Sequence, residues 1–493
     1  MLFSTLSFFV FLPLVFVLYW FVFNRQLKLQ NALLLLASYV FYGWWSWKFC
    51  GLLMLSTLID YAFGFWVASP NKQRARWFLL LSIINNLGLL FVFKYYNFFA
   101  TEFKHLVSMF GWSCNPVLLN WALPIGISFY TFHGMSYVFD IYRGKQVPVK
   151  SFVDYAVFVS FFPLLVAGPI ERASHLLPQI QQTRRFSYTQ AVEGCRLILW
   201  GLFKKIIIAD TLAPIVDSLF EHPETETAYA LLLGMLGFSI QIYGDFSGYS
   251  DMALGIAKLF GVELLSNFRF PYLSRNVAEF WRRWHISLSS WFRDYLYIPL
   301  GGSKDGRWKA VRNTCIIFLV SGFWHGASWN FIVWGGLHAL AFLPLLLLNK
   351  NKTFVHDVVG YGRLWPSLAE WIRVVGTFVF VSIAWVFFRI PSWEKAIHLF
   401  TRIIQEALRK PQQFFHKPVA YQVPDTTLLW IPLLVFISFV ADWYLRYNER
   451  QLRVPTKRWI RYGVYGVLFV VCLFKLIHTA VMATPVNFIY FQF

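Results

Sequence analysis

The sequence predicts an all-α membrane protein that crosses the bilayer many times. Of its 493 residues, 58% are hydrophobic and only 14% are charged, and the mean hydropathy is +0.52. Soluble globular domains carry about 25% charged residues, so this composition excludes an ordinary soluble protein. Long apolar runs separated by short basic clusters are typical of polytopic membrane proteins, and we expect about 11–13 helices with additional re-entrant segments.

Apolar segments recur along the whole chain. The first lacks a basic start and a small-residue cleavage site, so we expect a retained helix rather than a signal peptide. Several spans are shorter than the roughly 20 residues that a bilayer demands, and FFPLLVAGP at 161–169 is interrupted by proline and glycine, which favours a re-entrant or tilted element. The expected spans are 7–23, 31–45, 51–67, 77–93, 123–139, 152–166, 197–215, 228–243, 313–323, 329–348, 374–388, 428–444 and 462–480.

Basic residues between the spans predict the orientation. Arg25 and Lys28 follow the first span, and a dense basic cluster at 446–461 precedes the last one. Loops rich in lysine and arginine stay in the cytoplasm, so we expect both termini on the far side of the membrane. The net charge of +20 comes from such clusters, which we interpret as topology signals and lipid contacts, and no nucleic-acid partner is expected. No repeat or low-complexity linker is visible, and we expect one membrane domain over 1–493 with a short tail at 484–493.

Neither the cysteines nor the acidic residues form a metal-binding pattern. The five cysteines lie far apart without a C-x-x-C or Cys/His pairing, so we expect buried thiols. The stretch GDFSGYSD at 244–251 contains Asp245 and Asp251 beside glycines. We expect a broken helix here, with aspartates that pair with arginines. Two carboxylates at this spacing make no recognisable ligand set, and no metal is expected.

Two histidines indicate a reaction centre at membrane depth. His325 lies within the run 320–339, which contains no Lys, Arg, Asp or Glu, and His285 lies in the arginine-rich and aromatic segment 279–303. An ionisable group at such depth is costly and usually serves chemistry or transport. An imidazole with an ordinary pKa near 6.5 can take a proton from a hydroxyl and return it to a thiolate. A core histidine that is hydrogen-bonded across helices is the alternative for each. The remaining candidates, which we expect to be structural, are His133, His175 and His338.

Five long motifs resemble the membrane-bound O-acyltransferase family. Within it, the chain is similar to the bacterial branch that contains the membrane subunits of alginate and peptidoglycan O-acetylation and, more distantly, of teichoic-acid D-alanylation. The resemblance implies a helical shell around a funnel, with an acyl donor that enters from the cytoplasm. The motifs are LPIGISFYTFHGMSYVFDIYRG (123–144), FPLLVAGPIER (162–172), GDFSGYSDMALGIAKLFG (244–261), EFWRRWHISLSSWFRDYLYIPLGG (279–302) and SGFWHGASWNFIVWGGLH (321–338).

The same resemblance implies an activity and its partners. The two functional histidines of the family match His285 in the R-W-H motif and His325 in the W-H-G motif. Acetyl-CoA is the implied donor, and a cell-envelope polysaccharide of the peptidoglycan or alginate type is the implied acceptor. The chain shows no serine-hydrolase signature, so a separate periplasmic O-acetyltransferase of the SGNH/GDSL type is the implied partner. The expected location is the bacterial inner membrane, with both termini in the periplasm.

Arginines near His285 are candidates for binding the donor. Arg282, Arg283 and Arg293 could hold the phosphates of coenzyme A, because a guanidinium group makes bidentate contacts with phosphate. Anchoring at the membrane surface is an equally good interpretation of these charges. Helical spacing also places Arg283 next to Glu279, at i,i+4.

The last residues suggest an acyl relay. FIYFQF at 488–493 fits the pattern F-x-Y-x-x-F, which resembles the end of a small companion membrane protein of the D-alanylation system. The resemblance implies that Tyr490 accepts the acyl group and passes it to the external transferase. A phenol with an ordinary pKa near 10 needs a base to become nucleophilic, and a histidine can supply one. An aromatic belt at the outer interface is the alternative.

Two functions from other classes remain open. A proton-coupled transporter would also place histidines at membrane depth, but its repeated halves and matching discontinuous helices are not visible in this sequence. A non-catalytic scaffold of a polysaccharide export complex would tolerate the loss of both histidines. The motifs favour a membrane O-acyltransferase over both.

Overall fold

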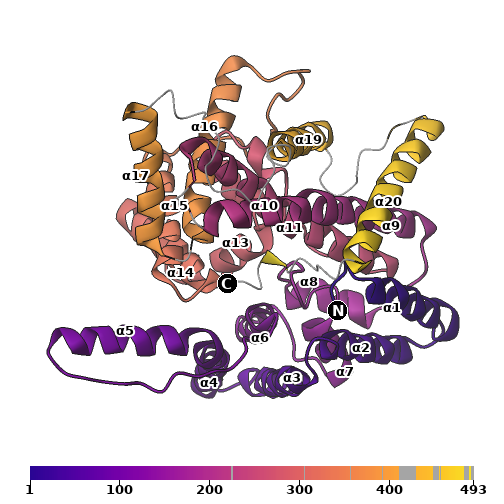
Figure 1. Ribbon diagram of the computed structural model, residues 1–493. Coiled ribbons are helices and arrows are strands. Elements are labelled where there is room, and N and C mark those ends of the chain that lie inside the picture. The colour runs from indigo at the N-terminus through magenta and orange to yellow at the C-terminus, as the bar shows by residue number, and fades with distance from the viewer. Residues whose placement is uncertain are drawn as a thin grey trace. The chain divides into compact units, whose positions relative to one another are not determined.

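The architecture is all-helical, as the sequence predicted (Figure 1). The described residues divide into two compact units, Met1–Ile198 with Met252–Leu265, and Leu199–Asp251 with Ser266–Phe493. The expectation of one membrane domain over the whole chain stays a prediction. The computed structural model describes residues 1–221, 223, 226–304, 306–355, 357–390, 392–409, 429–447, 455, 457–481 and 488–489.

The first unit is built from helices that pack through small and polar residues. Asp60 of α3 is buried and accepts hydrogen bonds from the side chains of Asn86, at 2.7 Å, and Ser82, at 3.3 Å, both on α4. Such polar contacts hold membrane helices together where lipid gives apolar surfaces no preference for one another. The helices are α1 (Leu6–Val17), α2 (Leu27–Gly43), α3 (Trp47–Val67), α4 (Lys72–Leu90), α5 (Tyr96–Met109), α6 (Ile127–Tyr142), α7 (Phe152–Ser160), α8 (Ala173–Gln181) and most of α9 (Tyr188–Leu202).

The interrupted segment that follows α7 is buried. Residues 161–170 are non-helical, and each of them is buried. The N–H of Phe162 donates to the hydroxyl of Ser38 at 3.0 Å, so part of this irregular backbone is satisfied inside the protein. Irregular backbone at membrane depth is tolerated under that condition. The predicted re-entrant path stays a prediction.

The second unit contains an antiparallel hairpin of α14 (Arg307–His325) and α15 (Trp329–Leu347). Its core is aromatic, and the indole rings of Trp334 and Trp385 stack with centroids 5.6 Å apart. The other elements are η3 (Phe203–Ala209), α10 (Asp210–Glu221), α11 (Ala228–Leu259, shared with the first unit), η4 (Pro271–Leu273), α12 (Val277–Arg283), α13 (Ile286–Phe292), η5 (Arg293–Tyr297), α16 (Leu368–Arg389), α17 (Trp393–Arg409), α19 (Trp430–Leu445) and α20 (Arg458–Val481).

Helices of membrane-spanning length occur in both units, which confirms a polytopic membrane protein. Within the described part of the chain, six stretches are long and apolar enough to cross a bilayer, and two shorter apolar helices accompany them, at Leu6–Val22 and Trp430–Leu445. The six are Trp47–Val67, Lys72–Met109, Ala228–Leu259, Trp329–Leu347, Leu368–Arg389 and Arg458–Val481.

The expectation of a broken helix at 244–251 is wrong. Helix α11 runs without a break from Ala228 to Leu259, well beyond the expected end at 243. The two glycines of this stretch serve close packing instead. A Cβ atom at Gly248 would lie 2.7 Å from the carbonyl oxygen of Gly201, and one at Gly244 would lie 3.1 Å from that of Lys204. Small residues four apart let two backbones approach closely in membrane helices.

This close packing predicts that one added methyl group destabilises the protein at Gly248 but not at a glycine with open space around it. Gly248→Ala should destabilise the protein by roughly 1–3 kcal/mol, because the new methyl group meets backbone that cannot rotate away. Thermal unfolding in detergent, followed by the loss of the monodisperse peak, measures the effect. Gly376→Ala in α16 is the matched control, since no described atom lies within 4 Å of its Cβ position. Equal melting temperatures for the two variants would contradict the packing argument.

Candidate active site

The second unit brings together the two histidines that the sequence singles out. His325 is the last residue of α14, and His285 joins α12 to α13. Their ring centroids lie 6.4 Å apart. Both side chains are buried, with 0% of His285 and 4% of His325 exposed. Two imidazoles that are remote in sequence therefore share one buried site.

The backbone at His285 adopts a conformation that few side chains tolerate. Its φ of 43° lies in the left-handed region, which is strained for a residue with a Cβ atom. The N–H of Trp284 donates to the carbonyl of Phe280 at 2.8 Å, and the N–H of Ser289 donates to the carbonyl of His285 at 3.0 Å. Strain of this kind persists where the surroundings enforce it, and it clusters at functional sites. Burial lowers the pKa of His285 to about 3, so its ring is neutral at physiological pH.

His325 is placed by a tight turn between α14 and α15. A Cβ atom at Gly326 would lie 2.1 Å from the ring of Phe331, and one at Gly322 would lie 2.1 Å from the carbonyl oxygen of Phe331. Only glycine allows this approach at either position. The glycine of the W-H-G motif therefore has a steric role, which is to let the hairpin close directly after His325.

Aromatic rings line the site around both imidazoles. The ring of Phe246, from α11, lies 4.7 Å from that of His285, centroid to centroid. Aromatic walls exclude water and so strengthen electrostatic interactions inside the site. The rings of Trp324, Trp334 and Phe388 lie 4.9, 5.2 and 5.2 Å from that of His325.

His338 has a different environment from the histidine pair. Its Nδ1 accepts a hydrogen bond from the indole N–H of Trp281 at 3.2 Å. Its ring lies nearly parallel to those of Phe280 and Phe318, with interplanar angles of 5° and 16°. These contacts account for a buried histidine without any chemistry, which supports the structural role expected for it.

The two other histidines with an expected structural role lie in the first unit. The Nε2 atom of His133 accepts a hydrogen bond from the N–H of Glu171 at 3.1 Å. The carboxylate of the same glutamate lies 2.7 Å from Nδ1 of His175. Both rings are thus engaged in local hydrogen bonds.

A cavity of about 660 Å³ opens beside α12 and α13. Its volume lies in the range of small-molecule sites. Ile286 and Ser289, which closely follow His285, contribute to its wall. The charged residues of its described lining are Arg269, Arg282, Arg283, Arg293, Lys352 and Asp357. All three arginines that the sequence analysis selected are therefore here, and five cations against one carboxylate suit a polyanionic ligand.

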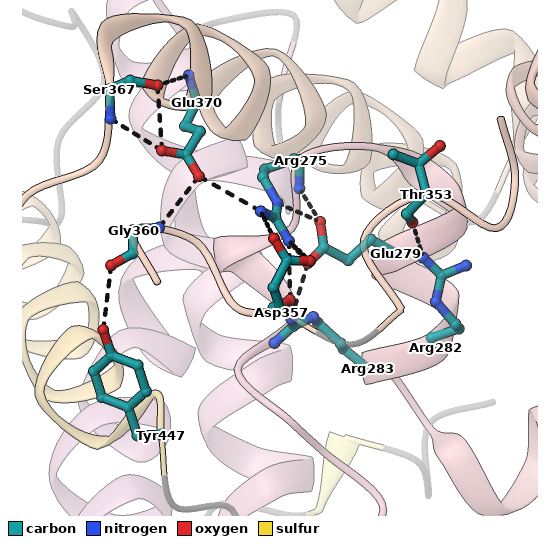
Figure 2. Close-up of polar contacts among 10 residues, drawn as sticks. All are labelled: Arg275, Glu279, Arg282, Arg283, Thr353, Asp357, Gly360, Ser367, Glu370 and Tyr447. Carbon is teal, nitrogen blue, oxygen red and sulfur yellow. Dashed lines mark hydrogen bonds and ion pairs between the residues drawn. The ribbon is translucent and has the colours of Figure 1, made fainter. Parts of the chain in front are cut away.

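An ion-pair network forms part of the cavity wall (Figure 2). Arg275 donates to both carboxylate oxygens of Glu279, at 3.1 and 3.0 Å, and to Asp357 at 3.1 Å. Arg283 donates to Glu279 at 2.8 Å, as the i,i+4 spacing predicted. Burial alone would lower the pKa of Arg275, but the hydrogen bonds and charge of Glu279, and then those of Asp357, raise it. Glu370 of α16 also approaches Arg275, at 3.5 Å, so the network joins three segments of the chain.

The other two predicted arginines are less constrained. Arg282 donates to the carbonyl oxygens of Asn351, at 2.6 Å, and Thr353, at 2.7 Å. Burial lowers the pKa of Arg282, so an anion that enters the cavity would stabilise its charge. Arg293 pairs with Asp294 at 2.8 Å, and its side chain is 63% exposed. Arg293 can thus turn toward a ligand with little loss of buried structure, whereas Arg282 would exchange its two main-chain acceptors for the ligand.

A smaller apolar cavity, of about 250 Å³, shares part of this lining. Trp281, Ser289 and Arg293 belong to both cavities. A basic compartment next to an apolar one is complementary to a ligand with an anionic head and an uncharged arm. The apolar part of the smaller lining includes Phe292, Tyr297, Ile317, Phe318, Phe342 and Leu346.

Two buried lysines of the second unit were not predicted as part of the site. Lys204 pairs with Asp251 at 2.7 Å, and Lys205 pairs with Asp245 at 2.8 Å and Asp210 at 2.7 Å. The expectation that the aspartates pair with arginines is therefore wrong. Both lysines belong to the π-helix η3, whose wider turn separates successive side chains by a smaller rotation, so both reach α11. Two adjacent lysines inside the apolar span 197–215 could have indicated these buried ion pairs.

The described residues contain no candidate metal site. Within these residues, no group of three His, Cys, Asp or Glu side chains could hold a metal ion.

Of the C-terminal motif, Phe488 and Ile489 are described, whereas Tyr490 lies outside the described residues. The ring of Phe488 lies 6.3 Å from that of Phe246, which in turn contacts His285. The start of the motif thus lies one aromatic ring away from the histidine pair.

Known proteins resemble this chain over most of its length. Residues 34–367 match the membrane-bound O-acyltransferase family. The chain is 40% identical to the probable alginate O-acetylase AlgI of Azotobacter vinelandii, over 80% of this chain and 76% of that protein. It is 36% identical to the peptidoglycan O-acetyltransferase of Helicobacter pylori, over 80% and 78% respectively. Identity to the teichoic acid D-alanyltransferase of Bacillus subtilis is 28%, over 54% of this chain and 68% of that protein. The resemblance seen in the five motifs is confirmed, and the chain belongs to the membrane-bound O-acyltransferase family and is an O-acyltransferase.

Proposed function

We propose that this protein moves an acetyl group from cytoplasmic acetyl-CoA across the bacterial inner membrane, for the O-acetylation of a cell-envelope polysaccharide of the peptidoglycan or alginate type. The observation that carries this proposal is the contact between His285 and His325 beside a basic cavity. The names of the two relatives that act on alginate and peptidoglycan support acetyl as the transferred group. The acceptor polysaccharide follows from the same names.

The two cavities support coenzyme A as the carrier of the acetyl group. Its phosphates suit the larger cavity, where Arg282 and Arg293 can reorient toward an anion. Its uncharged pantetheine arm suits the smaller apolar cavity, which shares Trp281 and Ser289 with the larger one. Ser289 also donates its N–H to the carbonyl of His285, so the cavity wall and the imidazole belong to one short segment.

The chemistry requires one proton to leave the acceptor and one to reach the leaving group. His325 takes the proton from the acceptor hydroxyl, whose oxygen attacks the thioester carbonyl. The carbon–sulfur bond breaks as the carbon–oxygen bond forms, and the proton passes to the departing thiolate. His285 adjoins the cavity lining through Ile286, so we assign it to the donor side of the reaction. The products are an acetyl ester and free coenzyme A.

The proposed function also involves a periplasmic partner and the surrounding lipid. The loops rich in arginine and lysine favour periplasmic termini, which would place Tyr490 on the side of the acceptor. A separate periplasmic enzyme of the SGNH/GDSL type would take the acetyl group from Tyr490 and transfer it to the polysaccharide. Membrane lipid is the other expected partner, because the helices expose large apolar side chains.

His325→Gln should reduce O-acetylation by at least about 100-fold, because glutamine keeps a hydrogen-bonding side chain and removes the base. Ester content of the cell-wall polysaccharide in a strain that expresses only the variant is the measurement. His338→Gln is the matched control, since its amide oxygen can still accept the N–H of Trp281, and it should retain activity. Wild-type ester content with His325→Gln would exclude catalysis by this residue and favour a scaffold.

Replacing Arg282 and Arg293 together with glutamine should weaken coenzyme A binding about tenfold or more, because two cations of the larger cavity are lost. Calorimetry on the protein in nanodiscs measures the affinity. Wild-type binding should weaken with added salt, since exposed charges are screened over about 8 Å at physiological ionic strength. Lys395→Gln, exposed on α17 and outside both cavity linings, is the control. Unchanged affinity would leave these arginines as membrane-surface anchors.

Tyr490→Phe should abolish transfer to the external partner while hydrolysis of the donor thioester persists, because only the nucleophilic oxygen is removed. Mass spectrometry of the wild-type C-terminal peptide after incubation with acetyl-CoA should reveal an added mass of about 42 Da, the difference between an acetyl group and a proton. The variant should lack that adduct. Full O-acetylation by Tyr490→Phe would rule out an obligatory relay.

A further inference from the structure

Asp245 of α11 contacts the C-terminal motif directly. Its Oδ2 accepts a hydrogen bond from the backbone N–H of Ile489 at 2.7 Å. Its other oxygen, Oδ1, pairs with Lys205 at 2.8 Å. The buried carboxylate of Asp245 thus binds Lys205 through one oxygen and the main chain at Ile489 through the other. Hydrogen bonds to an ionised carboxylate are about twice as strong as neutral ones.

The surroundings hold this carboxylate in place. Lys205 is also paired with Asp210 at 2.7 Å, and it is almost completely buried. Gly248 lies one turn further along α11 and permits the backbones of α11 and η3 to meet. η3 also packs against α20, the last described long helix. Charges at such depth are costly, and buried ion pairs often add little stability, so a functional reason for their presence is expected.

Aromatic contacts also bind the motif, and we call its binding site, formed by Asp245, Phe246 and Tyr249 of α11, the seat. Phe488 is fully buried, and its ring centroid lies 5.1 Å from that of Tyr249. Tyr249 lies one helical turn beyond Asp245 on α11, so the same face of the helix binds both the side chain of Phe488 and the N–H of Ile489. Phe246, on the same stretch, contacts both Phe488 and His285. The seat therefore adjoins the proposed reaction centre.

We propose that Asp245, held by Lys205, is a positioning residue that fixes the C-terminal segment at Phe488 and Ile489 for acyl transfer. Tyr490 follows directly in the sequence, so the seat sets where its hydroxyl can reach. This inference rests on the proposed function for the role of Tyr490. The binding of the segment by Asp245 can be tested without it.

Ile489→Pro is the sharpest test, because proline deletes the N–H that Asp245 accepts and leaves the buried ion pairs untouched. The measurement is the rate at which a carboxypeptidase releases residues 490–493 from the full chain in nanodiscs, followed by mass spectrometry. Release should be at least tenfold faster than in wild type. Acetyl transfer to the C-terminal peptide should fall by a similar factor, while coenzyme A affinity stays at the wild-type value.

Ile489→Val is the matched comparison, since it shortens the side chain by one methyl group and keeps the N–H. The proposal requires Ile489→Pro to release residues 490–493 at least tenfold faster than Ile489→Val. Asp245→Asn, which removes the charge that binds Lys205, should also accelerate release and lower transfer. Equal release rates for Ile489→Pro and wild type, or for Ile489→Pro and Ile489→Val, would overturn the role of Asp245.

The two proposals fail in different ways. If Tyr490→Phe transfers acetyl normally but Ile489→Pro exposes the C-terminal residues, the relay is wrong and the seat stands. If Tyr490→Phe is inactive and Ile489→Pro behaves as wild type in both assays, the relay stands and the seat is wrong.

Discussion

The cost of burying charge governs how the second unit is assembled. An isolated ion in an apolar interior costs several kcal/mol, and this cost is offset when a partner of opposite charge lies within contact distance. Arg275 meets this condition through Glu279, and Lys205 meets it through Asp245. Arg275 also pairs with Asp357, and this pair, like that of Lys205 and Asp245, joins segments that are remote in the chain, so the requirement for a partner helps to decide which elements meet. The two imidazoles of the same unit lie among aromatic rings.

Much of the candidate site could be predicted from the sequence, but not its connections. His325 was recognisable because it is embedded in an uncharged run, and the pair of Glu279 and Arg283 followed from helical spacing. The contact between His325 and His285 depends on tertiary packing, which the distance along the chain does not encode. The same holds for Arg275, which has two further carboxylate partners in remote segments.

The fold class could be predicted from composition, but the course of helix α11 and the presence of helix α17 could not. Glycines in an apolar helix can mark a break or a close approach of backbones, and α11 uses Gly244 and Gly248 for the second purpose. Helix α17 was not among the expected spans, because its charged residues lower the hydropathy of a helix that still buries Ala396 and Leu399. Hydropathy detects segments that cross a bilayer, and amphipathic helices escape it.

The hydrogen bond between Trp281 and His338 links the core to both cavities. The indole of Trp281 lines both cavities. Its N–H donates to the ring of His338, which is not among the lining residues of either cavity. The orientation of that indole therefore depends on a position with no direct access to a ligand. Under the proposed function, in which the two cavities bind the acyl donor, selectivity for the length or bulk of that donor can therefore change through substitutions in the core, while the proposed reacting groups stay the same.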